Sequence, residues 1–534
     1  MNDKKFKQIF PFEKPRKLQR KLIEKITEYF DEGYQHIVVN APTGIGKSIV
    51  AVAVANYFLD IEDSSATNSA YILTSQKLLQ DQYVKDFSVP TVKGRANYKC
   101  TFEKGTCEGA ICVRKKWKKT QRIQNCPNCP YYTARDKTYN NPISVLNYSF
   151  FLNMGIGEPE NEIQTNRKLL IMDECTNAEA IVIDHSSVIM DRFQCNKFNF
   201  YGSVLDFPSV DTSEEAKFNW LLNVVYPEFC EEYKIESVNF ESLTPEDSSY
   251  MSSFKKLQFL KDMKCKIQNI KEEYEAGMPC AVIQKSNKEI KFKPIFGKNL
   301  AKKYLLPFSS RTLSMSATVL SKEQYCRDMG FKKEETMFIR LPSLFPVYNR
   351  KIYSIGVGSM SYKNKVATLP KIAETVELLL EKHKGQRGII HTVNYETAEY
   401  LIGHLNSQRL IMPRGKTRDA EIEYFMKSSQ DDLVLISPSL QEGIDLKDDL
   451  SRFTIICKVP YASLADDWVK KRMGLSPNWY SEQAVQSIIQ MTGRSVRTES
   501  DTAVGYILDS DFNWFYKRNK SKFLNWWSES LIIK

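Results

Sequence analysis

The sequence lacks the features of exported and membrane proteins. Residues 1–7 do not place an apolar stretch after positive charge, and no uninterrupted apolar run reaches the roughly 20 residues that a membrane span needs. Internal repeats and low-complexity segments are also missing. We therefore expect a globular, cytoplasmic protein with no membrane partner.

The composition is that of an ordinary globular chain with a basic surplus. The 534 residues are 42% hydrophobic and 12% aromatic, and this length allows two to four domains. Lysine and arginine total 75 against 64 acidic residues, which gives a formal net charge of +11. A basic surplus favours a polyanionic partner, although many basic proteins bind no nucleic acid.

One glycine-rich stretch predicts a nucleotide site. It lies between apolar runs at 36–40 and 49–59, so we expect a strand, a loop and a helix. The spacing fits a phosphate-binding P-loop, and the alternative is a glycine-rich turn without a ligand. Lys47 would reach the β- and γ-phosphates, and Ser48 would hold Mg²⁺. The loop residues are Ala41, Pro42, Thr43, Gly44, Ile45, Gly46, Lys47 and Ser48.

Two helices are expected beside this loop. The first begins just after Arg16 and Gln19, which are candidates to contact the adenine base unless they only cap the helix. The second covers 76–87, and we expect Leu79 and Gln82 on its inner face.

Two adjacent carboxylates end the apolar run at 168–174. Open α/β sheets bind ligands at the carboxyl ends of their strands, where Asp173 can hold Mg²⁺ and Glu174 can orient and deprotonate the attacking water. Such an ending is a weak signal alone and a strong one after a P-loop. A later strand ends in Ser316-Ala317-Thr318, whose polar groups can couple the nucleotide site to a second ligand.

Five of the twelve cysteines are clustered, at Cys100, Cys107, Cys112, Cys126 and Cys129. Thiolates select zinc or iron–sulfur clusters, and four of them complete either a tetrahedral zinc site or a 4Fe–4S cube. Spacing does not separate these two, and free structural cysteines are the remaining alternative. Between the cysteines, five cations surround Trp117, which suits a nucleic-acid backbone and one stacked base but also a solvated face.

The last third predicts a second α/β unit without a P-loop. Its expected strands are 387–393, 432–439 and 452–459, and its helices include 396–405 and 419–427. A helix starting near Glu482 carries Gln490, and Arg494 and Arg497 follow on one face. Both arginines can stabilise charge on a transferring phosphoryl group, unless they are simply exposed on the helix.

Read together, these motifs resemble the XPD/DinG family of superfamily 2 helicases, whose order is Arg-x-x-Gln, P-loop, cysteine cluster, Asp-Glu box, Ser-Ala-Thr, Glu-Gly-x-Asp and Gln-x-x-Gly-Arg-x-x-Arg. The resemblance covers nearly the whole chain, and its most specific stretches are GRANYKC, CPYYTAR and QMTGRSVR. It adds Gly443, Asp445 and Gln490 to the residues expected to bind the nucleotide.

The resemblance implies an α/β fold with two RecA-like motor domains. A cysteine-rich iron–sulfur domain and an α-rich Arch-like domain are expected as inserts in the first motor, with zinc as the lesser alternative to a 4Fe–4S cluster. The expected parts are 1–95, 136–185 and 301–345 for the first motor, 96–135 for the cysteine-rich domain, 186–300 for the Arch-like insert and 346–534 for the second motor.

The function implied by the resemblance is that of an ATP- and Mg²⁺-dependent DNA helicase. We expect a monomer that moves 5′ to 3′ on single-stranded DNA and unwinds duplex or forked DNA, with RNA and protein partners left open. The alternatives are a translocase that does not separate strands and a nucleotide-gated module that clamps single strands.

Three departures from the family pattern bear on this function. The Asp-Glu-Ala-His box reads Asp173-Glu174-Cys175-Thr176, so a threonine replaces the histidine that would link the γ-phosphate site to the Ser-Ala-Thr strand, and coupling of hydrolysis to DNA comes into doubt. Five cysteines replace four; Cys100 and Cys129 match the first and last ligands, and two of the other three would complete the set. No nuclease domain is expected ahead of the first motor.

Overall fold

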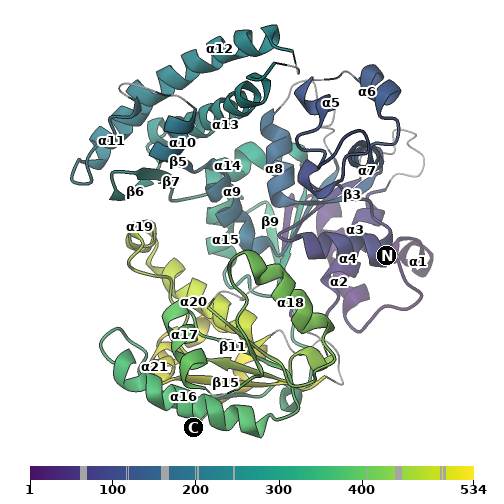
Figure 1. The fold of residues 1–534 in the computed structure, drawn as a ribbon. Helices are drawn as coiled ribbons and strands as arrows, with labels where there is room; N and C mark the ends of the chain where they lie inside the picture. The colour runs from purple at the N-terminus through teal and green to yellow at the C-terminus, as the bar shows by residue number, and fades with distance from the viewer. Residues whose placement is uncertain are drawn as a thin grey trace.

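Two parallel sheets and one small antiparallel sheet organise the chain (Figure 1). The computed structural model describes residues 1–534 apart from 60–68, 116, 118, 158–166, 199, 201–203, 245–246, 406, 439–447, 494–495 and 497–500. No helix in the described ranges combines the length and the apolar character that a bilayer span requires.

The first α/β unit contains a six-stranded parallel sheet in the order β3-β2-β4-β8-β1-β9. The strands are β1 (His36–Asn40), β2 (Ala70–Thr74), β3 (Ile143–Asn147), β4 (Leu169–Asp173), β8 (Thr312–Ser316) and β9 (Thr336–Arg340). The helices of this unit are α1 (Asp3–Ile9), α2 (Gln19–Asp31), α3 (Lys47–Tyr57), α4 (Lys77–Phe87), α8 (Tyr148–Gly157), α9 (Ala178–Ser186), α14 (Lys298–Tyr304) and α15 (Lys322–Met329).

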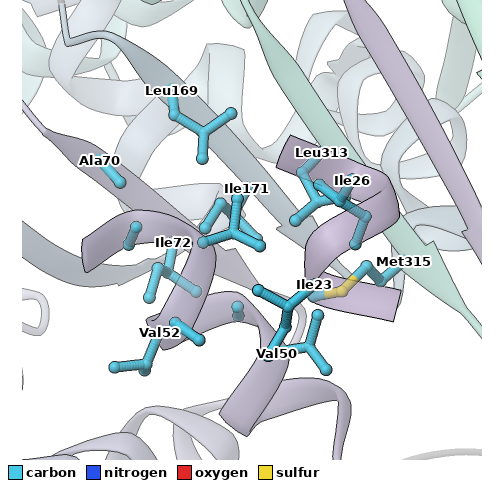
Figure 2. Packing of buried hydrophobic residues seen from close by; sticks show 14 of the residues in the cluster. Ile23, Ile26, Val50, Val52, Ala70, Ile72, Leu169, Ile171, Leu313 and Met315 are labelled. Atoms are coloured by element: carbon cyan, nitrogen blue, oxygen red, sulfur yellow. The ribbon is translucent and has the colours of Figure 1, made fainter. Parts of the chain in front are cut away.

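Helices cover both faces of this sheet, which explains why its strands are nearly continuous apolar runs. Figure 2 shows one face, where Ile23 and Ile26 of α2 and Val50 of α3 pack toward Ile171 and Leu313 of the strands. Helices α8, α9, α14 and α15 contribute to a second buried cluster with residues from the opposite face. The strand ends that carry the P-loop and the Asp173-Glu174 pair therefore belong to a sheet that is buried on both faces.

Two segments extend from this unit. The cysteine segment (residues 95–139) contains α5 (Ile111–Arg114), α6 (Lys119–Asn125) and α7 (Pro130–Tyr139). The helical insert (residues 188–294) contains β5 (Val188–Asp191), α10 (Arg192–Lys197), α11 (Glu214–Trp220), α12 (Tyr226–Ser242), α13 (Tyr250–Glu275), β6 (Cys280–Ser286) and β7 (Glu289–Pro294). Its long helices agree with the sequence pattern. The antiparallel sheet β5-β7-β6 was not predicted, because these short strands lie at the two ends of a segment dominated by helical periodicity.

The second α/β unit contains a seven-stranded parallel sheet in the order β12-β13-β11-β14-β15-β10-β16. Its strands are β10 (Ile352–Gly358), β11 (Gly388–His391), β12 (Leu410–Ile411), β13 (Val434–Ser437), β14 (Phe453–Ile456), β15 (Val504–Asp509) and β16 (Leu531–Ile533). Its helices are α16 (Lys365–Lys382), α17 (Tyr395–His404), α18 (Arg418–Lys427), α19 (Asp467–Leu475), α20 (Pro477–Thr492), α21 (Asp511–Asn519) and α22 (Asn525–Ser528). Helix α20 begins five residues before the predicted start near Glu482, because Pro477 suits the first turn of a helix.

Candidate nucleotide site

The P-loop has the shape that its sequence predicts. Gly44 and Gly46 have φ of +82° and +84°, backbone angles that residues with side chains rarely adopt, and α3 begins at Lys47. An added Cβ on Gly46 would meet the Gln19 side chain, which would have to shift. The loop presents the N-terminus of α3, where free N–H groups and the helix dipole favour an anion.

Arg16 and Gln19 lie against this loop. Gln19 Nε2 donates to Ile45 O at 2.8 Å, and Arg16 Nη1 donates to Gly44 O at 3.1 Å. Gln19 is fully buried, and Leu18 occupies the cap position of α2 without a side-chain hydrogen bond. The pair therefore supports the P-loop instead of capping a helix, and its contact with adenine stays a prediction.

Asp173 and Glu174 face the P-loop at the end of β4. Lys47 Nζ lies 3.7 Å from Glu174 Oε1. Burial, reinforced by the charge of Glu174, raises the pKa of Asp173 to about 6, and the charge of Lys47 acts in the opposite direction. A divalent cation would offset the repulsion between these two neighbouring carboxylates. The oxygen atoms of Asp173 and Ser48 are of the kind that Mg²⁺ binds.

Helix α4 contributes a side chain that the sequence did not predict. Gln82 is exposed and Leu79 only partly buried, so the predicted inner face is wrong; Gln80 and Tyr83 are the buried residues of this helix. Tyr83 Oη donates to Asp173 Oδ2 at 3.0 Å. Burial raises the pKa of Tyr83 well above its usual value, so it stays a neutral donor. The helical pattern of α4 did not identify Tyr83 as a site residue, because its hydrogen-bond partner lies 90 residues away in the sequence.

Hydroxyl groups connect Glu174 to the second unit. Ser316 Oγ donates to Glu174 Oε2 at 3.0 Å, and Thr176 Oγ1 lies 3.3 Å from the same serine oxygen. Two residues farther on, Thr318 Oγ1 accepts from Gln490 Nε2 of α20 at 3.3 Å. The threonine that replaces the expected histidine therefore still contacts the Ser-Ala-Thr strand.

The second unit forms the facing wall of the site. Thr43 Oγ1 of the P-loop donates to Gly493 O, just after α20, at 3.1 Å. A small cleft between the units is lined by Thr176 and Glu179 on one side and Gln486 on the other, and none of the P-loop residues lines it. Four predicted residues of this wall, Gly443, Asp445, Arg494 and Arg497, lie outside the described residues.

The five clustered cysteines gather in the cysteine segment. Cys107 lies close to Cys129 and Cys100, and Cys112 lies close to Cys100, Cys126 and Cys129. Burial raises the pKa of the Cys107 thiol to about 12. Across the described ranges, no three His, Cys, Asp or Glu side chains are arranged to hold a metal ion. The thiols thus have the right chemistry for zinc or an iron–sulfur cluster without forming a closed ligand shell.

Two family models match the chain. The model described as type III restriction enzyme, res subunit, matches residues 12–198, and the helicase C-terminal domain model matches residues 378–530. The first match contains the P-loop and the two carboxylates, and the second contains most of the seven-stranded sheet.

Similar proteins align along nearly the whole chain. The ATP-dependent DNA helicase YoaA of Haemophilus influenzae is 22% identical over 89% of this chain and 88% of its own length, and YoaA of Escherichia coli is 22% identical over 95% and 93%. The solved structure of S. tokodaii Xpd4 has a TM-score of 0.59 at 14% identity, covering 97% of this chain and 100% of that chain, which shows a shared fold. The two parallel sheets fit RecA-like domains, and along nearly its whole length this chain is similar to ATP-dependent DNA helicases of the XPD/DinG-like kind.

Proposed function

We propose that ATP and Mg²⁺ bind between the two RecA-like domains and that hydrolysis drives movement on DNA. The supporting observation is the group around Lys47, which pairs with Glu174 while Ser316 holds the other oxygen of that carboxylate. A γ-phosphate would take over the lysine and leave Glu174 oriented to deprotonate water. Ser48 and Asp173 would hold Mg²⁺, which neutralises charge on the phosphates.

The remaining contacts come from both domains. Arg16 and Gln19 would hold adenine at the outer end of the P-loop, and Gln490 with Gly443 and Asp445 would complete the second wall. Arg494 and Arg497 would approach the γ-phosphate when the domains close. Because such arginines act on the transition state, Arg494→Ala should lower ATP turnover by about 10³ or more. Normal turnover in this variant would show that the cleft is wrongly assigned.

We also propose that the enzyme moves 5′ to 3′ on single-stranded DNA and unwinds forked duplexes. The names of the YoaA relatives include DNA helicase activity, and the charge of +11 suits a phosphate backbone. The Thr176–Ser316 contact supports coupling of hydrolysis to this movement, because it joins the Asp-Glu box to the strand that Gln490 touches.

Strand displacement tests this function directly. Duplexes with a single-stranded tail at the 5′ or the 3′ end are incubated with ATP and either the wild type or Lys47→Ala. We expect displacement from the 5′ tail alone and none with the variant. ATPase activity that rises with single strands while neither duplex opens would favour a translocase that does not unwind.

A 4Fe–4S cluster held by the cysteine segment belongs to this proposal. Cys100 and Cys129 would be ligands together with two of Cys107, Cys112 and Cys126, and the cluster would fix the segment as a wedge at a DNA fork, with the basic stretch around Trp117 beside one strand. Iron and zinc analysis of anaerobically purified protein decides between the metals. Colourless protein with one zinc per chain would rule out the cluster. The helical insert would take the place of the Arch-like domain.

A further inference from the structure

A buried tyrosine hydroxyl lies between the two side chains proposed to hold Mg²⁺. Tyr83 is 1% exposed, and its Oη donates to Asp173 Oδ2 at 3.0 Å. The Ser48 side chain lies close to the same hydroxyl. Because the tyrosine hydrogen is directed at Asp173, Tyr83 Oη has a lone pair available to accept from the Ser48 hydroxyl. Tyr83 therefore lies between Ser48 and Asp173, with its own hydrogen bond made to Asp173.

This order of donors is the one that a metal site requires. A serine oxygen that binds a cation uses its lone pair, so its hydrogen must point away from the metal toward an acceptor. Tyr83 Oη is that acceptor. Its own hydrogen then fixes Asp173 Oδ2, while Asp173 Oδ1 accepts from the Glu174 N–H at 3.1 Å. Both carboxylate oxygens are thus oriented before any ligand arrives, which limits the entropy lost on binding.

We propose that Tyr83 is a positioning residue for Mg²⁺, whose hydroxyl orients the Ser48 hydroxyl and the Asp173 carboxylate for metal binding. The inference rests on the proposed function of the P-loop site. It differs from a packing role, because the ring of Tyr83 belongs to the apolar cluster under the sheet and a phenylalanine would fill that space equally well. Only the hydroxyl distinguishes the two roles.

The chain offers a matched control at Tyr148. This tyrosine is also 1% exposed, and its hydroxyl donates to the backbone oxygen of Asp173 at 3.3 Å. It is therefore as deeply buried as Tyr83 and has the same partner residue, but it contacts the backbone of Asp173 and not the carboxylate.

The experiment measures how much Mg²⁺ is needed for nucleotide binding. Wild type, Tyr83→Phe and Tyr148→Phe are titrated with Mg²⁺ in the presence of a fluorescent ADP analogue, and binding without Mg²⁺ is measured in parallel. We expect Tyr83→Phe to raise the half-saturating Mg²⁺ concentration by about tenfold or more, as loss of a group behind a metal ligand commonly does. Binding without Mg²⁺ should be unchanged, which also establishes that the P-loop is folded. Tyr148→Phe should match the wild type.

An unchanged Mg²⁺ requirement in Tyr83→Phe would overturn the role of Tyr83, as would an equal shift in both variants. If Tyr83→Phe does not fold, Tyr83→Met also lacks the hydroxyl and carries the same expectation. Failure of the P-loop assignment itself would give a different binding result. Wild-type protein that binds the analogue no better than Lys47→Ala, at any Mg²⁺ concentration, would overturn the P-loop assignment and the role of Tyr83 together.

Discussion

Two of the contacts between the RecA-like domains, one made by Arg472 of α19 and one made at α20, differ in character. In the α19 contact, the fully buried Arg472 donates to Glu179 at 3.0 Å and to Asp328 at 2.9 Å. In the α20 contact, neutral groups meet at longer range: Gln490 donates to Thr318 at 3.3 Å, and the P-loop hydroxyl of Thr43 donates to the second domain at 3.1 Å. One contact is buried and charged, and the other is neutral and partly exposed.

This difference indicates which side of the interface opens. A neutral hydrogen bond contributes about 0.5–1.5 kcal/mol, whereas removing one partner of a buried ion pair costs about 3–5 kcal/mol. We infer that the α19 contact holds the domains together while the α20 contact, beside the P-loop, separates to admit ATP. Helix α19 also touches the helical insert, because Trp468 Nε1 donates to Pro294 O at 2.8 Å. Rotation of the second domain about α19 would therefore be transmitted to the insert.

Arg472→Ala is expected to have the largest effect, because it removes the buried, charged contact and leaves the neutral one in place. The substitution leaves Glu179 and Asp328 buried without their guanidinium, so we expect a loss of about 3–5 kcal/mol in unfolding free energy. The radius of gyration from small-angle scattering should rise as the domains separate. Lys470→Ala is the control, because Lys470 pairs only within α19, with Asp467 at 2.9 Å. An Arg472→Ala protein as compact and stable as this control would contradict the anchoring role.

The α19 contact should also depend on pH. Burial, with the charge of Asp328, raises the pKa of Glu179 to about 8, because two buried carboxylates share one guanidinium. The folded state therefore binds this proton more tightly than the unfolded state does. The resulting stabilisation is complete below about pH 4.5 and is lost as the pH rises toward 8; each pKa unit corresponds to about 1.4 kcal/mol, so the effect is of the order of a few kcal/mol.

Urea unfolding between pH 5 and 9 checks this dependence. Wild-type stability should fall across the range, and Glu179→Gln, which cannot ionise, should have a flatter profile. Parallel profiles for the two proteins would show that Glu179 is already ionised in the folded state at pH 5. The Gln490–Thr318 bond is the internal comparison, since neither of these two side chains titrates.

The sequence predicted the features that depend on neighbouring residues and missed those that depend on residues far apart in the chain. The P-loop, the Asp173-Glu174 ending and the strands around them are encoded within a dozen residues each, so local pattern was sufficient. Tyr83 and Arg472 act on partners 90 and 144 residues away, and their own neighbours give no sign of this. The five cysteines are an intermediate case. The sequence places the thiols in one short segment, but whether four of them form a ligand shell depends on how that segment folds around a metal.

The smallest expected effect is that of Gln490→Ala in the α20 contact. Its 3.3 Å bond to Thr318 is long and partly exposed, so unfolding free energy should fall by about 1 kcal/mol or less. Function should respond more than stability, because the same residue joins the second domain to the strand whose Ser316 holds Glu174. We therefore expect ATP turnover stimulated by single-stranded DNA to fall while turnover without DNA changes little. Asn478→Ala, an exposed position on the same helix whose partner Lys522 belongs to the same domain, is the control. Equal loss of DNA stimulation in both variants would mean that α20 acts only as a packed wall, and the division between a fixed and an opening contact would then rest on α19 alone.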